Sequence, residues 1–221
     1  MKKNQDIKLI PVLELQPSAF SKIERESPKK SYLEAPQEWI NYNQKCYNDS
    51  GLKNIKPVEQ LSWLFKIEML SDEELKIILK HLMDDAVEDF DSINEILDDP
   101  IEYAPLIPGG YVFEVNKVIK SRPICCCGLE DIIEWKDAQT IWTGHGKDDF
   151  VQIVKDNTQV EIIINKETFL LSREAYNQII KNAEIQIDKF IERSGKLLRE
   201  LLRIENGEAF ARAMIYKWDE K

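Results

Sequence analysis

Apolar residues recur every three or four positions through the part of the chain that follows Pro36, which is the spacing of helices with one buried face. Pro36 and Pro57 each stand where a first helical residue would. Ser71, with Glu74 three residues later, is typical of a capping box. We therefore expect three helices, the first ending near Gly51. Their apolar faces are Trp39, Ile40, Cys46 and Tyr47; Val58, Leu61, Leu64, Phe65 and Met69; and Leu75, Ile78, Leu79, Leu82, Met83 and Ala86.

Shorter elements flank these helices. Asp91 is placed to cap a further helix through residues 93–97, which Pro100 would stop. Before the helices, residues 1–35 combine a strand-like segment at 7–15 with a polar stretch rich in charge and proline. This composition predicts an extended arm or loop on the surface.

The period changes to two after Gly110. Tyr111, Phe113 and Val115 alternate with polar or smaller residues, which predicts a half-buried strand running to Ile119. Residues 150–154 and 160–164 are two more strand-like runs, and the polar segment between them indicates a hairpin with Asn157 available for a positive φ. We expect one small, mainly antiparallel sheet.

A long helix closes this pattern. Ser172 is suited to cap it, and an apolar stripe continues to Ile204 at spacings of three and four: Tyr176, Ile180, Ala183, Ile187, Phe190, Ser194, Leu197, Leu201 and Ile204. We favour packing of this stripe on the chain's own sheet over dimerisation, because neighbouring apolar residues broaden it. Gly195 is a candidate bend, Asn206 and Gly207 a stop, and residues 209–218 a closing helix.

The elements together predict an α+β protein. It has a helical N-terminal half, a small mainly antiparallel sheet and a long C-terminal helix packed on that sheet. We expect a single domain over residues 1–221, divided into the arm or loop at 1–35, a helical acidic part at 36–106, and the sheet with the long helix at 107–221. The apolar content of 43% is ample for a core.

The net charge of −10 comes from one region of the sequence. Between His81 and Asn116 there is no lysine or arginine, while ten carboxylates occur there. The rest of the chain is balanced, because 40 acidic and 30 basic residues leave 30 of each once these ten are set aside. The acidic balance argues against nucleic acid and anionic membranes as partners, since both reward lysine and arginine at the contact.

This acidic sector, residues 81–116, has two main interpretations. One is a solvated surface that keeps the protein soluble. The other is a docking surface for a basic protein, because clustered carboxylates accelerate encounters with a positively charged partner. A calcium loop is rejected, because Ile93 stands where a third oxygen ligand belongs and no glycine turn follows. The residues expected to bind a partner are Asp84, Asp85, Glu88, Asp89, Asp91, Glu95, Asp98 and Asp99.

The start of the chain and its cysteines indicate a cytoplasmic protein. The first residues contain only a short apolar run, broken by Asp6, Lys8 and Pro11, and so match neither a signal peptide nor a membrane span. Of the four cysteines, three are consecutive, at Cys125, Cys126 and Cys127. Adjacent cysteines make a poor disulfide framework, so we expect reduced thiols.

The cysteine triplet and His145 are the candidates for catalysis. The thiols precede a short helix predicted from Leu129 onward, where free amides lower a thiol pKa, and His145 would be the base for a Cys126 nucleophile. Glu130 and Asp131 oppose this, because their negative charge in the first turn disfavours a thiolate.

Metal binding is a further interpretation of the same stretch. Cys125, Cys127 and His145 are the candidate ligands, completed by His81 or Cys46. The consecutive spacing is unlike that of zinc sites, which pair cysteines two to four residues apart. We favour a structural role without catalysis, metal or cofactor, in which the thiols pack among three apolar residues: Trp135, Trp142 and Ile124.

Two sequence segments, CCCGLEDIIEW and IWTGHGKDDFVQI, carry a resemblance. Over about residues 124–153 they resemble a pattern in small bacterial proteins, some of which are similar to immunity proteins of toxin systems. The chain contains no glycine-rich phosphate loop, HExxH or GxSxG motif. We therefore expect a non-catalytic binding protein, a monomer or homodimer, with two alternatives: a Cys- or metal-dependent enzyme, and a homo-oligomeric structural protein built on residues 172–204.

Overall fold

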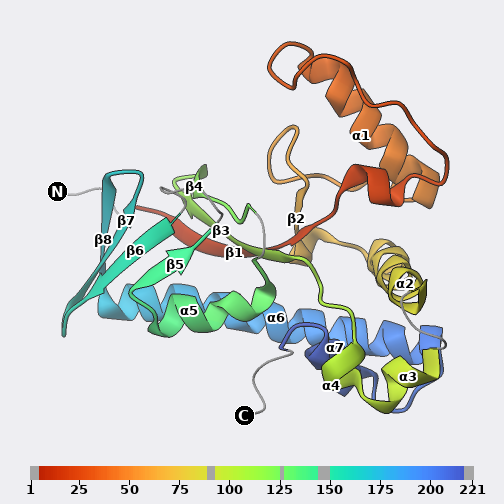
Figure 1. The fold of residues 1–221 in the computed structure, drawn as a ribbon. Helices are drawn as coiled ribbons and strands as arrows, with labels where there is room; N and C mark the ends of the chain where they lie inside the picture. Colours follow the sequence, from red (N-terminus) through yellow and green to blue (C-terminus); the bar gives the residue numbers. More distant parts are fainter. Residues whose placement is uncertain (1–4, 89–92, 125–126, 144–149, 217–221) are drawn as a thin grey trace. The chain divides into compact units, whose positions relative to one another are not determined.

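The computed structural model of the chain describes residues 5–88, 93–124, 127–143 and 150–216 (Figure 1). Contacts divide the chain into two compact units, each assembled from stretches far apart in sequence. Unit 1 contains residues 1–12 and 108–189, and unit 2 contains residues 13–107 and 190–221. Strand β1 (Ile7–Glu14) and helix α6 (Arg173–Leu202) each contribute to both units. The single domain expected from the sequence stays a prediction.

The strands form two four-stranded sheets. The first has the order β2-β1-β3-β4, and its other members are β2 (Leu64–Lys66), β3 (Gly109–Val115) and β4 (Val118–Ser121). The second has the order β5-β6-β7-β8 and contains only strands of unit 1: β5 (Thr140–Trp142), β6 (Phe150–Lys155), β7 (Gln159–Ile164) and β8 (Glu167–Ser172). The expectation of one sheet is therefore wrong in number. The cysteine-rich stretch, residues 123–146, follows β4 of the first sheet and leads into β5 of the second.

Tight asparagine turns shape both sheets. Asn116 and Lys117 join β3 to β4, and Asn165 and Lys166 join β7 to β8, all four with positive φ between 50° and 68°. Two consecutive positive φ angles are typical of type I′ hairpins, and asparagine adopts them at low cost. The strand predicted to run unbroken from Tyr111 to Ile119 is thus wrong, because it folds back on itself at Asn116.

The hairpin predicted between residues 154 and 160 is confirmed, but its turn is held differently. Asp156 Oδ1 accepts hydrogen bonds from the backbone N–H groups of Thr158 and Gln159, each at 2.6 Å. Asn157 is not among the residues with positive φ. The turn is therefore held by the Asp156 carboxylate, which accepts from two backbone N–H groups, and not by a left-handed conformation at Asn157.

Helix α6 packs on the strands of the second sheet through its first half, which confirms the predicted α+β class with a long helix (Figure 1). The Tyr176 hydroxyl donates to the carbonyl of Trp135, and the Lys155 ammonium lies 5.3 Å from the centre of the Tyr176 ring. The inward residues of the sheet alternate along each strand and are buried: Ile141, Val151, Ile153, Val160, Ile162, Ile164, Phe169 and Leu171.

The apolar stripe of α6 is buried along most of its length. Tyr176, Ile180, Ala183 and Ile187 are buried in unit 1, and Phe190, Ser194 and Leu197 in unit 2. Self-packing therefore accounts for the stripe, as expected from its width. No helix in the described part of the chain is both long enough and apolar enough to cross a membrane.

Unit 2 is mainly helical, as the sequence predicts for this part of the chain. Helix α1 (Pro36–Ser50) starts at a proline and ends at Gly51, whose φ of 98° is left-handed. Helix α2 (Asp72–Glu88) follows the predicted capping box, in which Ser71 Oγ accepts from the Glu74 N–H at 3.2 Å and Glu74 accepts from the Ser71 N–H at 2.9 Å. The remaining elements are η1 (Pro17–Phe20), η2 (Ile67–Met69), α3 (Ile93–Asp98), α4 (Pro100–Tyr103) and α7 (Gly207–Ala213).

The helix predicted to start at Pro57 is wrong. Residues 57–63 form turns, with Leu61 at a φ of 65°, and β2 follows them. The backbone is engaged elsewhere, because Leu15 N donates to Trp63 O and Val58 N donates to Leu64 O, each at 2.8 Å. Pairing with distant residues overrides the local helical spacing.

The strand-like segment predicted at residues 7–15 is confirmed as β1, so the surface arm or loop predicted over residues 1–35 does not include this part. Leu9, Ile10, Val12 and Leu13 of β1 are buried. The later part, residues 21–35, does run along the surface, but it is fastened to α1: the Arg25 guanidinium donates to both carboxylate oxygens of Asp49 at 2.8 Å. A bidentate pair of this kind has a defined geometry.

Candidate functional site

The cysteine-rich stretch, residues 123–146, is described except for residues 125–126 and 144–146. Cys125, Cys126 and His145, which carry the catalytic and metal predictions, belong to that undescribed part. Cys127 is described and half-buried, and its thiol Sγ lies 3.7 Å from the carbonyl oxygen of Trp142, as a weak donor. Ile124 N donates to Thr143 O at 2.7 Å, so the two ends of the stretch are bonded together.

The three apolar residues expected to surround the thiols have different environments. Trp135 is buried, with 2% of its surface exposed, whereas Trp142 is 60% exposed and Ile124 is 50% exposed. Since Cys125 and Cys126 lie outside the described residues, the packing of the thiols among these three residues stays a prediction. Trp142 points outward because side chains alternate along β5 and its neighbour Ile141 points inward.

The helix predicted after the thiols is confirmed as a 3₁₀ turn, η3 (Leu129–Asp131), continued by α5 (Ile132–Asp137). Gly128 N donates to Asp131 Oδ2 at 3.0 Å, and the Tyr111 hydroxyl donates to Leu129 O at 2.5 Å. An amide at the start of the helix is thus bonded to a carboxylate of the chain itself. The activation of a thiol that such amides would provide is reduced accordingly.

Among the described titratable groups of this stretch, Asp131 has the pKa that its surroundings shift most. Burial raises the pKa of its carboxyl from 3.8 to about 7, which outweighs the lowering by the Gly128 amide. The negative charges of Glu130 and Glu134 raise the pKa further. A raised carboxyl pKa means that the folded protein holds a proton at pH values where the unfolded chain has released it.

The Asp131→Asn variant is expected to be more stable than the wild type at about pH 8 and to lose this advantage on acidification. The stability that Asp131 contributes is complete below about pH 4 and is lost as the pH rises through about 7, whereas asparagine does not titrate. The full shift would amount to about 4 kcal/mol; partial solvent access reduces this, so we expect about 2 kcal/mol. Urea denaturation across this pH range measures the difference.

Asp137→Asn is the matched control, because Asp137 is an exposed carboxylate at the end of the same helix. We expect the free energy of unfolding of Asp137→Asn to follow that of the wild type across the pH range. If the free energies of unfolding of the wild type and of Asp131→Asn change in parallel with pH, the raised pKa of Asp131 is contradicted.

The two residues proposed to complete a metal site have other contacts. Cys46 is fully buried in unit 2, and the His81 ring lies 4.4 Å from the Phe20 ring, with Nε2 3.3 Å from Asp85. Within the described part of the chain, no group of three or more His, Cys, Asp or Glu side chains is arranged to hold a metal ion. The metal and catalytic residues named from the sequence therefore stay predictions.

The acidic sector is described in part. Asp84 and Asp85 lie near the C-terminal end of α2, with 60% and 61% of their side chains exposed. Asp98 and Asp99 are exposed at the end of α3 and the start of α4, where Asp99 Oδ1 accepts from the Glu102 N–H at 3.2 Å. Asp89 and Asp91 lie outside the described residues, as do the side-chain environments of Glu88 and Glu95.

A pocket of about 150 Å³ in unit 1 was not anticipated from the sequence. Its wall combines the end of β4, the bonded ends of the cysteine-rich stretch, and the β7–β8 turn, and its polar residues include Ser121, Thr143 and Asn165. These residues lie 22 positions apart or more and belong to no motif, so only the Asn165-Lys166 turn signal was available in the sequence.

Comparisons of the chain with protein-family models, with curated proteins and with solved structures found no match.

Proposed function

We propose that this chain is a non-catalytic binding protein of the immunity type, which docks a basic toxin or enzyme through the acidic sector, residues 81–116. The observation that supports the proposal is the exposure of Asp84 and Asp85 in a sequence region with no lysine or arginine. The resemblance of residues 124–153 to bacterial proteins that include immunity-like members points in the same direction.

The orientation of α2 supports this role. Leu75, Ile78, Leu79 and Met83 are buried, so this helix turns its charged face to solvent. An exposed carboxylate keeps its hydration and its charge until a partner arrives, and a cluster of them attracts a basic protein over several ångströms.

The ion pairs within α2 leave these carboxylates able to change partner. Asp84 lies 2.5 Å from Lys80 and Asp85 lies 3.3 Å from His81, one helical turn earlier in each case. Exposed pairs at this spacing contribute only about 0.3–0.5 kcal/mol, because water screens them and the side chains lose freedom. A partner's arginine, which binds a carboxylate at two points, can therefore replace them.

Reversing Asp84 and Asp85, together with Glu88 and Asp89, to lysine is expected to abolish capture of a basic protein while changing thermal stability little. The change replaces attraction by repulsion at the docking surface, and no buried residue is altered among those described. Affinity capture from the host, followed by a binding titration of the captured basic protein with each variant, measures the effect.

A control with half the charge change reverses Glu24 and Glu26, which are exposed and lie in the loop that precedes α1. This control makes a charge change of the same sign elsewhere on unit 2. Capture that falls equally in both variants would indicate a non-specific charge effect, and capture unchanged by the reversal of the acidic sector would refute the proposal.

A further inference from the structure

Strand β8 lies at one edge of the second sheet, with β7 as its neighbour (Figure 1). In an antiparallel pair, the residues that bond to the neighbouring strand alternate with residues whose N–H and C=O groups point to the opposite side. Arg173 N donates to Thr158 O at 3.0 Å, one position beyond the last register pair of the two strands. The alternation therefore makes Phe169 and Leu171 residues that bond to β7.

The outward-pointing residues of β8 are Thr168 and Leu170, followed by Ser172 at its end. No backbone or side-chain group in the described part of the chain, apart from the sheet itself, bonds to the main chain of Thr168 or Leu170. Both side chains are exposed, and Leu170 has 47% of its surface accessible. The outer side of β8 therefore presents backbone donors and acceptors together with an exposed leucine.

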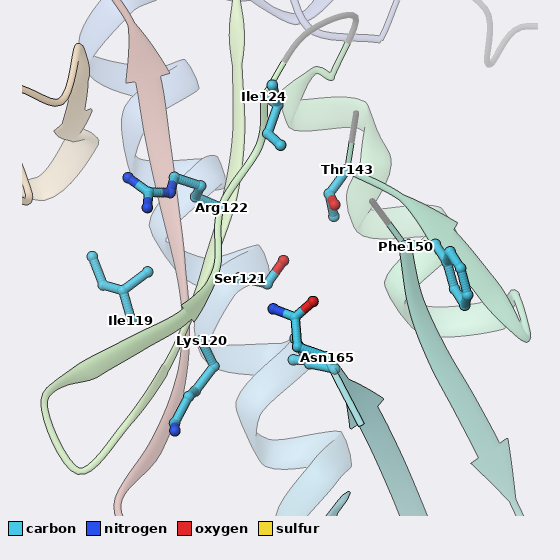
Figure 2. A pocket seen from close by; sticks show the side chains of 9 residues that line it. Ile119, Lys120, Ser121, Arg122, Ile124, Thr143, Phe150 and Asn165 are labelled. Carbon is cyan, nitrogen blue, oxygen red and sulfur yellow. The ribbon is translucent and has the colours of Figure 1, made fainter. Parts of the chain in front are cut away.

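Neighbouring segments of unit 1 approach β8 at its inner face and at its first residue. The Phe113 ring lies 5.7 Å from the ring of Phe169, which is buried, and Lys120 Nζ lies 2.7 Å from Glu167. Figure 2 shows Lys120 beside Asn165 of the β7–β8 turn, where the pocket of unit 1 lies, and no residue of β8 lines that pocket. These contacts leave the outward-pointing backbone of β8 uncovered.

This edge has none of the features that usually prevent pairing with another chain, such as lysine, proline, a bulge or a very short strand. Strand β8 has six residues, none of them lysine, proline or glycine, and its pairing with β7 contains no register shift. The opposite edge, β5, has three residues and is engaged, because Cys127 Sγ donates to Trp142 O and Ile124 N to Thr143 O. Of the two edges of this sheet, β8 is the one suited to receive a further strand.

The outward-pointing residues determine how a second copy of β8 can pair with the first. Antiparallel strands bond only where outward-pointing residues face each other. Placing Leu170 opposite Leu170 of the second copy meets this condition, since Thr168 then faces Ser172. A twofold axis relates the two strands, so each copy uses the same surface. The two exposed leucines then lie side by side on the outer face of the sheet.

The charges at the two ends of this register are complementary. Glu167 of one copy lies opposite Arg173 of the other, and both residues are exposed. The Glu167 carboxylate pairs with Lys120 through one oxygen and has a second oxygen to offer. The Arg173 guanidinium donates through Nη1 to Asp156 O and has further N–H groups. An opposite-charge pair at each end favours a second copy of this chain over an unrelated strand.

We propose that two copies of this chain form a symmetric dimer by antiparallel pairing of β8, with Leu170 of one copy opposite Leu170 of the other. The second sheets of the two copies then form one continuous sheet across the twofold axis. The surface lies in unit 1 and includes no residue of the acidic sector, so it is independent of the proposed function. It also does not use the apolar stripe of α6, which packs within its own chain.

Sedimentation velocity of the full chain over a concentration series tests the proposal. We expect the mass to rise from 25.8 kDa, that of one chain, toward that of two chains. Leu170→Lys is expected to weaken dimerisation about tenfold, because it removes the leucine contact and places two like charges opposite each other. Val154→Lys is the matched control and is expected to leave dimerisation unchanged. Val154 is 54% exposed on the same face but belongs to β6, in the interior of the sheet.

A charge exchange tests the register. Glu167→Arg and Arg173→Glu are each expected to weaken dimerisation, because each places two like charges opposite each other at both ends of the paired strands. Combining the two substitutions restores an opposite-charge pair with the signs exchanged, so we expect the combined variant to dimerise more tightly than either single variant. A local structural effect of the two substitutions would not be reversed in this way.

Circular dichroism verifies that each variant is folded, and the charge exchange provides a second series if Leu170→Lys is not. The proposal is overturned if the wild type stays at 25.8 kDa throughout the concentration series. It is also overturned if Leu170→Lys dimerises as tightly as Val154→Lys, or if the combined charge variant dimerises no more tightly than the single variants.

Discussion

Replacing Gly195 or Gly207 by alanine is expected to lower the free energy of unfolding by about 2–3 kcal/mol. A Cβ at Gly195 would lie 2.6 Å from the Cα of Glu208, and a Cβ at Gly207 would lie 2.2 Å from the carbonyl oxygen of Gly195. Both obstacles are backbone atoms, so relief requires α6 and α7 to move apart. Urea denaturation followed by circular dichroism measures the loss.

The sign of this result is informative because alanine ordinarily stabilises a helix. In a helix interior, Gly→Ala adds about 1 kcal/mol when the new methyl group meets nothing. Gly195 lies well inside α6, which continues to Leu202. A Gly195→Ala variant as stable as the wild type, or more stable, would therefore contradict the close approach of the two helices.

Ser194→Ala is the control for this pair, one position away in the same helix. Ser194 is fully buried, and its hydroxyl has no hydrogen-bond partner among the described residues. Removing a buried hydroxyl of this kind is expected to be neutral or slightly stabilising. The contrast between neighbouring alanine substitutions isolates the effect of the added Cβ at Gly195.

These glycines also show what a sequence pattern leaves undetermined. Gly195 was expected to bend the long helix and Gly207 to stop it. The helix α6 is continuous through Gly195, where a bend stays a prediction. It ends at Leu202, before the predicted stop, where Arg203 adopts a left-handed φ of 57°, and Gly207 begins α7. A Cβ at either position would meet the backbone of the other helix, and such contact is not visible along the chain.

The elements that were predicted well are those determined by local chemistry. The capping box at Ser71 uses only neighbouring residues, as does the start of α1 at Pro36. The long helix was recognisable from its stripe alone, because one buried face repeats over many turns. Such signals depend on spacing and not on what the element packs against.

The elements that were missed depend on contacts between distant residues. The segment after Pro57 has helical spacing, yet it is drawn into strand pairing with the backbone around Leu15. Pro100, expected to stop a helix, also begins the next one, because Asp99 caps it. For the segment after Pro57 a contact between distant residues selects one of two conformations that the local sequence allows, whereas at Pro100 the cap from Asp99 is local.

Of the two candidate sites, one could be predicted from the sequence and the other depends on contacts between distant residues. The charge of the acidic sector follows from composition alone, and the exposure of Asp84 and Asp85 agrees with that reading. The pocket of unit 1 could not be predicted, because Ser121, Thr143 and Asn165 are ordinary surface-type residues until two sheets and a turn place them together. The Asn165-Lys166 pair repeats Asn116-Lys117, and this repeat was the available sign of two tight hairpins.

Phe113→Ala is expected to be the most destabilising single truncation in unit 1, with a loss of about 3–5 kcal/mol. The Phe113 ring is 1% exposed, stacks on Trp135 at 5.9 Å and 9°, and meets Phe169 at 5.7 Å and 58°. These rings come from β3, α5 and β8, so one side chain joins both sheets to the short helix that follows the cysteines. Its removal leaves a cavity that three different elements would have to fill.

Trp142→Ala is the comparison for this truncation. It removes a larger side chain from the same unit, but Trp142 is 60% exposed. We expect a cost below about 1 kcal/mol for Trp142→Ala, since little apolar surface is returned to water. Urea denaturation followed by far-UV circular dichroism avoids a signal that depends on tryptophan. Equal losses in the two variants would mean that the aromatic cluster of Phe113, Trp135 and Phe169 contributes no more than an exposed tryptophan. A far larger loss for Phe113→Ala would establish this cluster as part of the core of unit 1.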